Sequence, residues 1–129
     1  MKKKNKQLKK LYSINLGCKV NLFETNSVIN NLVIEDFVLI NDINQADLVL
    51  INTCSVTNNA DKKSKHFINQ ACKLVNKPII IVMGCFSQMN VEWFKNKANI
   101  IIGNKYKNNI PQLLKQYLKD KKQIIKIKL

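Results

Sequence analysis

Residues 48–57 of this chain, LVLINTCSVT, decide its fold: four apolar residues lead through Asn52 and Thr53 to a cysteine, Cys54. A short unbroken apolar run predicts a strand that is covered on both faces, as in parallel sheets. Thr57 is a suitable N-cap, and the segment that follows it has helical periodicity. The stretch therefore places a thiol between the end of a buried strand and the start of a helix.

Two more cysteines occupy the same kind of position. Cys18 follows the expected strand 11–16, and Cys85 follows the strand-like run 79–83. A glycine precedes each of them, which permits a tight exit from the strand. The three thiols thus share one structural context.

Expected strands and helices alternate along the chain, which predicts an α/β fold with right-handed crossovers. We expect a flavodoxin-like (Rossmann-like) three-layer sandwich with a mostly parallel five-stranded sheet in the order 2-1-3-4-5. Residues 123–129 fit either a strand or an extended linker. The expected strands are 11–16, 37–40, 48–51, 79–83 and 100–102, and the expected helices are 22–32, the segment after Thr57, a short stretch at 91–94, and 110–118.

In this strand order, Cys18, Cys54 and Cys85 follow three neighbouring strands. Neighbouring strands lie about 4.8 Å apart, so the three loops would start within about 10 Å of one another. Thiolates at that spacing could hold a 4Fe–4S cluster. Small buried cysteines are also common in cores, and no CxxC is present, so the residues alone leave both interpretations open. Cys72 lies on the apolar face of the helix after Thr57 and is interpreted as a core residue.

The formal net charge of +14 raises the possibility of nucleic-acid contact, but lysines concentrate at the two ends of the chain. All 22 basic residues are Lys. Lys contacts phosphate as a point charge, without the two-pronged geometry of Arg. No GxGxxG or P-loop motif is present, so no motif in the sequence supports a dinucleotide-binding or NTP-binding protein. No apolar run approaches a membrane span, and no signal peptide is seen, so we expect a cytoplasmic protein with reduced thiols.

Three blocks resemble the N-terminal domain of the radical-SAM methylthiotransferases, from about Leu11 to about Tyr117. The blocks are residues 16–21 with Glu24-Thr25, residues 52–57 with Ala60-Asp61 and Lys63-Ser64, and residues 84–88. The resemblance implies that Cys18, Cys54 and Cys85 bind an auxiliary 4Fe–4S cluster that supplies or relays sulfur.

The residues after the first two cysteines resemble one branch of that family most closely. Its members methylthiolate N6-threonylcarbamoyladenosine at position 37 of tRNA; the isopentenyladenosine and ribosomal-protein branches rank second and third. The resemblance implies a monomer that contacts the tRNA anticodon loop. It also implies radical-SAM and RNA-binding domains as partners, with S-adenosylmethionine and a second 4Fe–4S cluster in the radical-SAM barrel.

The chain departs from the family pattern because it contains no CxxxCxxC motif. By itself it is therefore not expected to cleave S-adenosylmethionine. We expect a basic arm at 1–10, the cluster domain at 11–119, and a tail or linker to an absent barrel at 120–129. The alternatives are a degenerate or split-off module that binds tRNA without catalysis, and a flavodoxin-like domain with incidental core cysteines.

Overall fold

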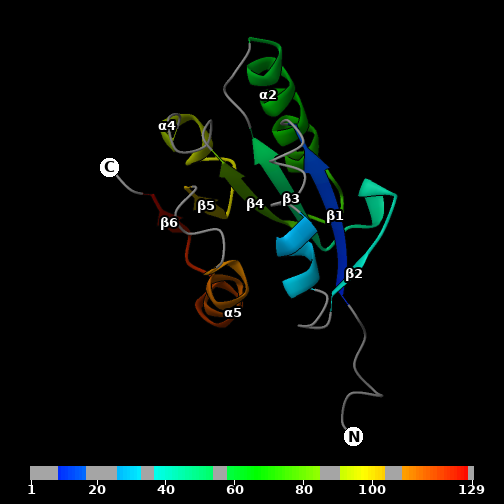
Figure 1. The fold of residues 1–129 in the computed structure, drawn as a ribbon, viewed down its shortest axis with the longest axis vertical. Helices are drawn as coiled ribbons and strands as arrows, with labels where there is room; N and C mark the ends of the chain where they lie inside the picture. Colours follow the sequence, from blue (N-terminus) through cyan, green and yellow to red (C-terminus); the bar gives the residue numbers. More distant parts are fainter. Residues whose placement is uncertain are drawn as a thin grey trace, which may run out of the picture.

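The computed structural model describes residues 9–16, 26–32, 37–53, 58–84, 91–103 and 109–127. Strands and helices alternate along this part of the chain (Figure 1). The strands are β1 (Lys9–Asn15), β2 (Phe37–Leu39), β3 (Leu48–Thr53), β4 (Ile79–Gly84), β5 (Ile100–Ile102) and β6 (Ile124–Lys126). The helices are α2 (Asn58–Cys72), α4 (Val91–Phe94) and α5 (Ile110–Asp120), with a 3-10 turn η2 (Ile43–Gln45). Residues 26–32 are also helical.

The described strands form one sheet in the order β2-β1-β3-β4-β5-β6, and every neighbouring pair is parallel. This confirms the α/β class and the predicted order of the first five strands. The structure adds a sixth strand at the β5 edge. The arrowheads of β1, β3 and β4 point the same way in Figure 1, so their carboxyl ends share one edge of the sheet.

The sixth strand resolves the choice between strand and linker for the C-terminal segment. Ile124 is buried and pairs with Ile100. The Gln123 side chain fixes the entry to β6, because its Nε2 donates to the carbonyl oxygens of Lys95 and Ala98. Sequence periodicity could not show this, since three residues of β6 give too little pattern and the anchoring amide bonds to residues far away in sequence.

Two hydrophobic clusters cover the two faces of the sheet, as a three-layer sandwich requires. In β3, Leu48 and Leu50 belong to one cluster, and Val49 and Ile51 to the other. The period-2 alternation of strand side chains therefore explains why all four apolar residues are needed. The first cluster includes side chains from 26–32 and α5, and the second includes side chains from α2 and α4; Figure 1 shows these helices around the sheet.

Several elements begin or end one or two residues away from the sequence expectation, and β1 is one of them. β1 begins at Lys9 rather than Leu11, because the backbone of Lys10 is held on both sides. Lys10 pairs with Val38 of β2, and the Lys10 N–H donates to Asp47 Oδ2 at 2.9 Å. Residues 1–8 of the expected basic arm and residues 22–25 of the expected first helix lie outside the described residues.

Candidate functional site

The candidate site is the edge of the sheet where β1, β3 and β4 end. The three strands are neighbours and end in register: Asn15 lies beside Asn52, and Asn52 beside Met83. One residue further, Thr53 pairs with Gly84, and the Leu16 N–H donates to the Asn52 carbonyl oxygen at 3.0 Å. The backbone is therefore hydrogen-bonded up to the last residue of each strand.

The three predicted ligands, Cys18, Cys54 and Cys85, lie outside the described residues. What the structure gives is the backbone that leads to them. Thr53 immediately precedes Cys54, and Gly84 immediately precedes Cys85. These two residues are direct partners across β3 and β4. Leu16, two residues before Cys18, is bonded to the same β3 strand.

Gly84 is the tightest point of this edge. Its φ is +107°, and a Cβ added there would lie 2.3 Å from the Thr53 carbonyl oxygen and 2.9 Å from Asn52 Oδ1. Only glycine fits such a conformation at such a distance. The absence of a side chain at Gly84 therefore lets β4 lie close against β3 at the position before Cys85.

The Thr53 side chain supports the same edge, whereas the buried hydroxyl of Ser64 on α2 does not contribute a bond to it in the described residues. Asn52 and Thr53 are fully buried, and Thr53 Oγ1 donates to the Met83 carbonyl oxygen at 2.8 Å. Ser64 of α2 is also fully buried, and its hydroxyl has no hydrogen-bond partner within the part of the chain that the structure describes. The ends of β3 and β4 are thus held by side-chain as well as backbone bonds.

The expectation that Cys72 lies in the core is wrong. Ser64, Ile68 and Ala71 form the buried face of α2, whereas Cys72 is exposed on its last turn. The Cys72 thiol donates to the Lys97 carbonyl oxygen at 3.4 Å. Although the residue as a whole is exposed, partial burial of its thiol raises the pKa of that group above its ordinary value, and the positive charge of Lys97 lowers it in part. The sequence pattern was misleading because α2 ends at Cys72, so the helical period does not continue beyond it: Leu74 still packs against the core, but Val75 is 95% exposed.

Aromatic residues near α2 and α4 pack rather than form a site. Phe94 is fully buried and meets Trp93 edge to face. Lys65 and Lys97 place their ammonium groups 5.4 and 5.1 Å from the centre of the Trp93 ring. The exposed His66 meets only Phe67 edge to face among the ring contacts of the described residues.

No group of three or more His, Cys, Asp or Glu side chains that could hold a metal ion occurs among the described residues. In those same residues, none of the helices is both long and apolar enough to cross a membrane.

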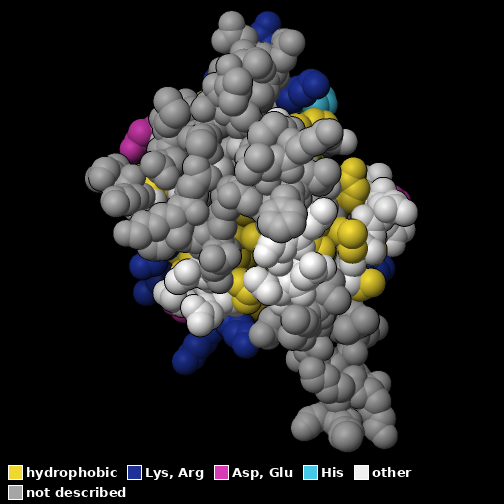
Figure 2. Space-filling view, viewed as in Figure 1, with side chains coloured by type: hydrophobic (Ala, Val, Ile, Leu, Met, Phe, Trp, Pro, Cys, Tyr) yellow, Lys and Arg dark blue, Asp and Glu magenta, His cyan; other side chains and the backbone are white. Residues whose placement is uncertain are grey.

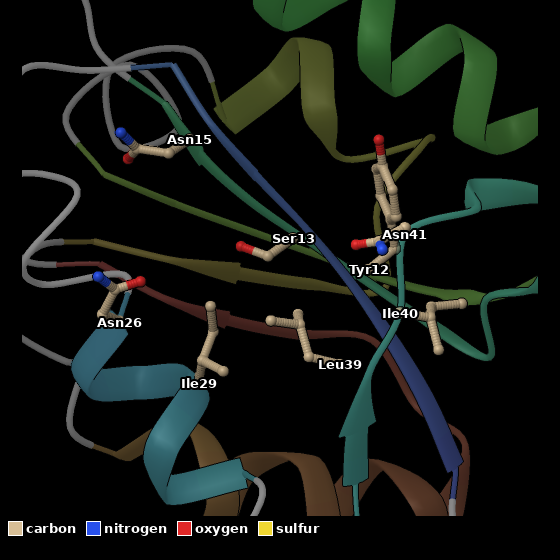
Figure 3. Close-up of a pocket in the computed structure, with 8 residues that line it drawn as sticks. All are labelled: Tyr12, Ser13, Asn15, Asn26, Ile29, Leu39, Ile40 and Asn41. Atoms are coloured by element: carbon tan, nitrogen blue, oxygen red, sulfur yellow. The ribbon is translucent and has the colours of Figure 1, made fainter.

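A cavity of about 330 Å³ beside β1 was not anticipated from the sequence. Uncharged polar side chains that include Asn15, Asn26 and Asn41 line it together with aliphatic ones (Figure 3). No motif marks these residues, because they come from three separate elements and asparagine is frequent throughout the chain. Only their position around the short strand β2 brings them together.

Comparison with known proteins gives a family. The model described as "Uncharacterized protein family UPF0004" matches residues 10–103. The chain is 30% identical over 114 residues to threonylcarbamoyladenosine tRNA methylthiotransferase MtaB of Aquifex aeolicus, and the match covers 85% of the chain and 28% of that protein.

Two further relatives show the same relationship. A tRNA-2-methylthio-N(6)-dimethylallyladenosine synthase of Vesicomyosocius okutanii is 32% identical over 127 residues, with 93% of the chain and 29% of that protein covered. MtaB of Chlamydia pneumoniae is 32% identical over 106 residues, with 79% of the chain and 25% of that protein covered. The chain thus spans between a quarter and a third of the length of these relatives.

Proposed function

Because this chain belongs to protein family UPF0004, the N-terminal domain family of the tRNA methylthiotransferases it resembles, we propose that it is the auxiliary 4Fe–4S domain of such an enzyme. Cys18, Cys54 and Cys85 are the proposed ligands. The proposed reaction is methylthiolation of N6-threonylcarbamoyladenosine at position 37 of tRNA; two of the relatives are named for threonylcarbamoyladenosine.

The observation that carries this proposal is the shared register at the ends of β1, β3 and β4. Thr53 and Gly84 are direct partners, and the residue that follows each of them in the sequence is a cysteine. Paired strands lie about 4.8 Å apart, so the chain segments that lead to Cys54 and Cys85 start from neighbouring positions. Cys18 follows the third strand of the same edge by three residues. Three thiolates that start from one edge suit an iron–sulfur cluster.

Cys72 and His66 are not proposed as ligands of the cluster. Cys72 is the last of the 15 residues of α2, and a helix of that length is about 22 Å long. Cys72 is therefore a helix length away from the end that follows Cys54. The exposed ring of His66 lies against Phe67 about two turns into the same helix.

When bound, the cluster would supply or relay the sulfur of the methylthio group. The contribution of this chain is to hold the ligands on a backbone that is bonded to the last residue of each strand. S-adenosylmethionine and the second 4Fe–4S cluster belong, in this proposal, to a radical-SAM barrel. We further propose that the domain works in the cytoplasm as a monomer, with that barrel and an RNA-binding domain, at the tRNA anticodon loop.

Anaerobic reconstitution with iron and sulfide tests the proposal. The wild-type chain should bind about four irons and show the visible absorbance of a thiolate-bound cluster. Cys18→Ala, Cys54→Ala and Cys85→Ala should each lose most of that iron, whereas Cys72→Ala should retain it. Unchanged iron uptake in the Cys54→Ala and Cys85→Ala variants would overturn the assignment.

A second candidate is a non-catalytic tRNA-binding module, favoured by the net charge of +14. It predicts RNA affinity that falls steeply with salt and persists without iron. Removal of residues 1–8 together with Lys121→Gln and Lys122→Gln, which leaves β6 in place, should then abolish RNA binding. RNA affinity that survives these changes would contradict the version of the module that binds through its lysine-rich ends.

A further inference from the structure

A second hollow lies at the edge of the sheet opposite the candidate site. It has a volume of about 380 Å³, and its lining includes the first residues of β1, β2 and β4, which are Lys9, Phe37 and Ile79. Because the described strands are all parallel, their amino ends share the edge that lies away from the candidate site. β3 spans about 20 Å between the two edges, so this amino-edge hollow is separate from that site.

Hydrogen bonds to Asp47, which also lines the hollow, fix the backbone around it. The Asp47 N–H donates to the Lys10 carbonyl oxygen at 2.8 Å, and the Lys10 N–H donates back to Asp47 Oδ2 at 2.9 Å. The Ile79 N–H donates to the Asp47 carbonyl oxygen at 2.9 Å. Asp47 therefore ties the beginnings of β1 and β4 together, and the floor of the hollow is formed by the fold itself.

Three lysines from separate segments line the amino-edge hollow. Lys9 begins β1, Lys77 lies in the connection from α2 to β4, and Lys121 is the C-cap of α5. Figure 2 shows lysine side chains gathered around and below α5, away from the arrowheads of the central strands in Figure 1. Lysine contacts phosphate as a point charge, so three lysines around one hollow favour a ligand of high negative charge.

Two of these lysines have an unfavourable backbone conformation. Lys77 and Lys121 have φ angles of 49° and 59°, and they are the two non-glycine residues with positive φ among those that the structure describes. Glycine or asparagine is usual at such positions, because other side chains meet steric strain there. Both strained residues are lysines that line the same hollow. This coincidence indicates a role for their side chains.

The neighbouring segments of the sequence add positive charge. Residues 1–8 and 33–36, next to two of the lining residues in the sequence, lie outside the described part of the chain. They carry four lysines and two acidic residues, Glu35 and Asp36. With the three lysines and one carboxylate of the lining, the total is seven positive and three negative charges. The segments that line or adjoin the hollow in the sequence are therefore basic when taken together.

The lining also has an apolar wall. Phe37 is buried, and the partly buried side chains of Ile79 and Leu118 pack against the same hydrophobic cluster. All three line the hollow. A bare inorganic anion would leave this wall in contact with water, whereas a ligand with both a phosphate and an apolar group would cover it. The volume lies at the small end of the range for ligand pockets, which suits a small molecule.

We propose that the amino-edge hollow binds a small phosphate monoester. The phosphate lies among the ammonium groups of Lys9, Lys77 and Lys121. The apolar part of the ligand lies against Phe37 and Leu118. A phosphate monoester carries a charge of about −1.5 to −2 at pH 7, and each phosphodiester of a nucleic acid carries one negative charge. Three cations around a concave site therefore favour a terminal phosphate over a polymer backbone. The proposal goes beyond the proposed function and does not rest on it.

NMR titration of the 15N-labelled full chain, iron-free and reconstituted, tests the proposal. Phenyl phosphate combines a phosphate monoester with an apolar ring, whereas inorganic phosphate and benzyl alcohol each carry one half of that chemistry. The backbone amide signals of Lys77 and Lys121 should shift in a saturable way with phenyl phosphate, and less with rising salt. Inorganic phosphate should bind more weakly and benzyl alcohol not at all. No saturable shift with phenyl phosphate overturns the proposal, as does tighter binding of a short oligouridylate without terminal phosphates at the same amides.

A pair of variants with equal charge makes the test specific. Lys77→Gln and Lys121→Gln are combined in one variant, which should bind phenyl phosphate about 5- to 30-fold more weakly. The matched control combines Lys62→Gln and Lys63→Gln, two exposed lysines of α2, and should bind as the wild type does. Equal weakening in both variants shows general charge attraction and overturns the site. Unchanged affinity in the first variant overturns it as well.

Glycine variants separate ligand binding from backbone conformation. Lys77→Gly and Lys121→Gly relieve the strain of the positive φ, so each should raise the unfolding temperature while it weakens the binding of phenyl phosphate. A purely structural role of the lysines would change stability and leave the affinity unchanged, and that result overturns the proposal. Iron uptake should equal that of the wild type in all these variants. The failure of this proposal can therefore be distinguished from the failure of the cluster assignment.

Discussion

Gly84 and Thr53 lie opposite each other across β4 and β3, so close that a Cβ on Gly84 would be 2.3 Å from the Thr53 carbonyl oxygen. Each residue immediately precedes one of the proposed ligands. The contact therefore sets how closely the two ligand loops begin.

Replacement of Gly84 by alanine should both destabilise the fold and disturb the site. The residue has a φ of +107°, which L-residues rarely adopt, and the added methyl group would clash with backbone. We expect a loss of unfolding free energy of about 2 kcal/mol or more, measured by urea denaturation. Iron uptake should fall as well. A Gly84→Ala variant with wild-type stability would contradict the close contact.

The Thr53 hydroxyl should stabilise the fold through its 2.8 Å hydrogen bond to the Met83 carbonyl oxygen. Thr53→Val keeps the shape but removes the donor, and we expect a loss of about 1–2 kcal/mol in unfolding free energy. Thr53→Ser keeps the hydroxyl and serves as the control for the hydrogen bond. If Thr53→Val and Thr53→Ser lose the same unfolding free energy, the hydrogen bond of the hydroxyl does not contribute to stability.

Ser64 should behave in the opposite way, because its fully buried hydroxyl finds no partner among the residues that the structure describes. Ser64→Ala removes a buried polar group and introduces the best helix former. We expect unchanged or increased stability, by up to about 1 kcal/mol in the same urea assay. A clear loss would show that the hydroxyl bonds to a residue outside the described part.

Lys77 and Lys121 have positive φ angles of 49° and 59°. Glycine adopts this conformation without steric cost, so Lys77→Gly and Lys121→Gly should each raise the unfolding free energy by roughly 0.5–1 kcal/mol. Lys122→Gly is the matched control, since Lys122 is also exposed and has no positive φ. A gain in the control as large as in the two variants would refute the conformational explanation.

The Cys72 thiol should react more slowly with iodoacetamide in the folded chain than in the unfolded chain, because its partial burial raises its pKa and lowers the thiolate fraction. The rate at pH 8, followed by peptide mass spectrometry, should be lower than in the urea-unfolded chain. Equal rates in the folded and unfolded chains would argue against the partial burial of the sulfur.

The raised pKa of Cys72 also makes the stability of the fold depend on pH. The folded state holds the thiol proton more tightly than the unfolded state does. The stabilisation from this proton is therefore complete below the unfolded pKa of 9.0 and is lost as the pH rises through the folded pKa.

The sequence predicted the parallel order of five strands because their apolar runs are short, separate and followed by helical segments. It was wrong for Cys72 and left β6 open between a strand and a linker, for one common reason. The exposure of Cys72 depends on where α2 ends against the sheet, and β6 depends on bonds from Gln123 to Lys95 and Ala98. Periodicity along the chain carries no information on either.

The sequence by itself determined the α/β alternation, the family and the three cysteines that follow strands, because each of these is written in local order along the chain. Only the tertiary structure decided that Thr53 and Gly84 meet in register and that Asn15, Asn26 and Asn41 share one cavity. The physical reason is that strand pairing and the early end of β2 are relations between segments distant in sequence. They arise when the sheet assembles, and no local pattern encodes the distance between its parts.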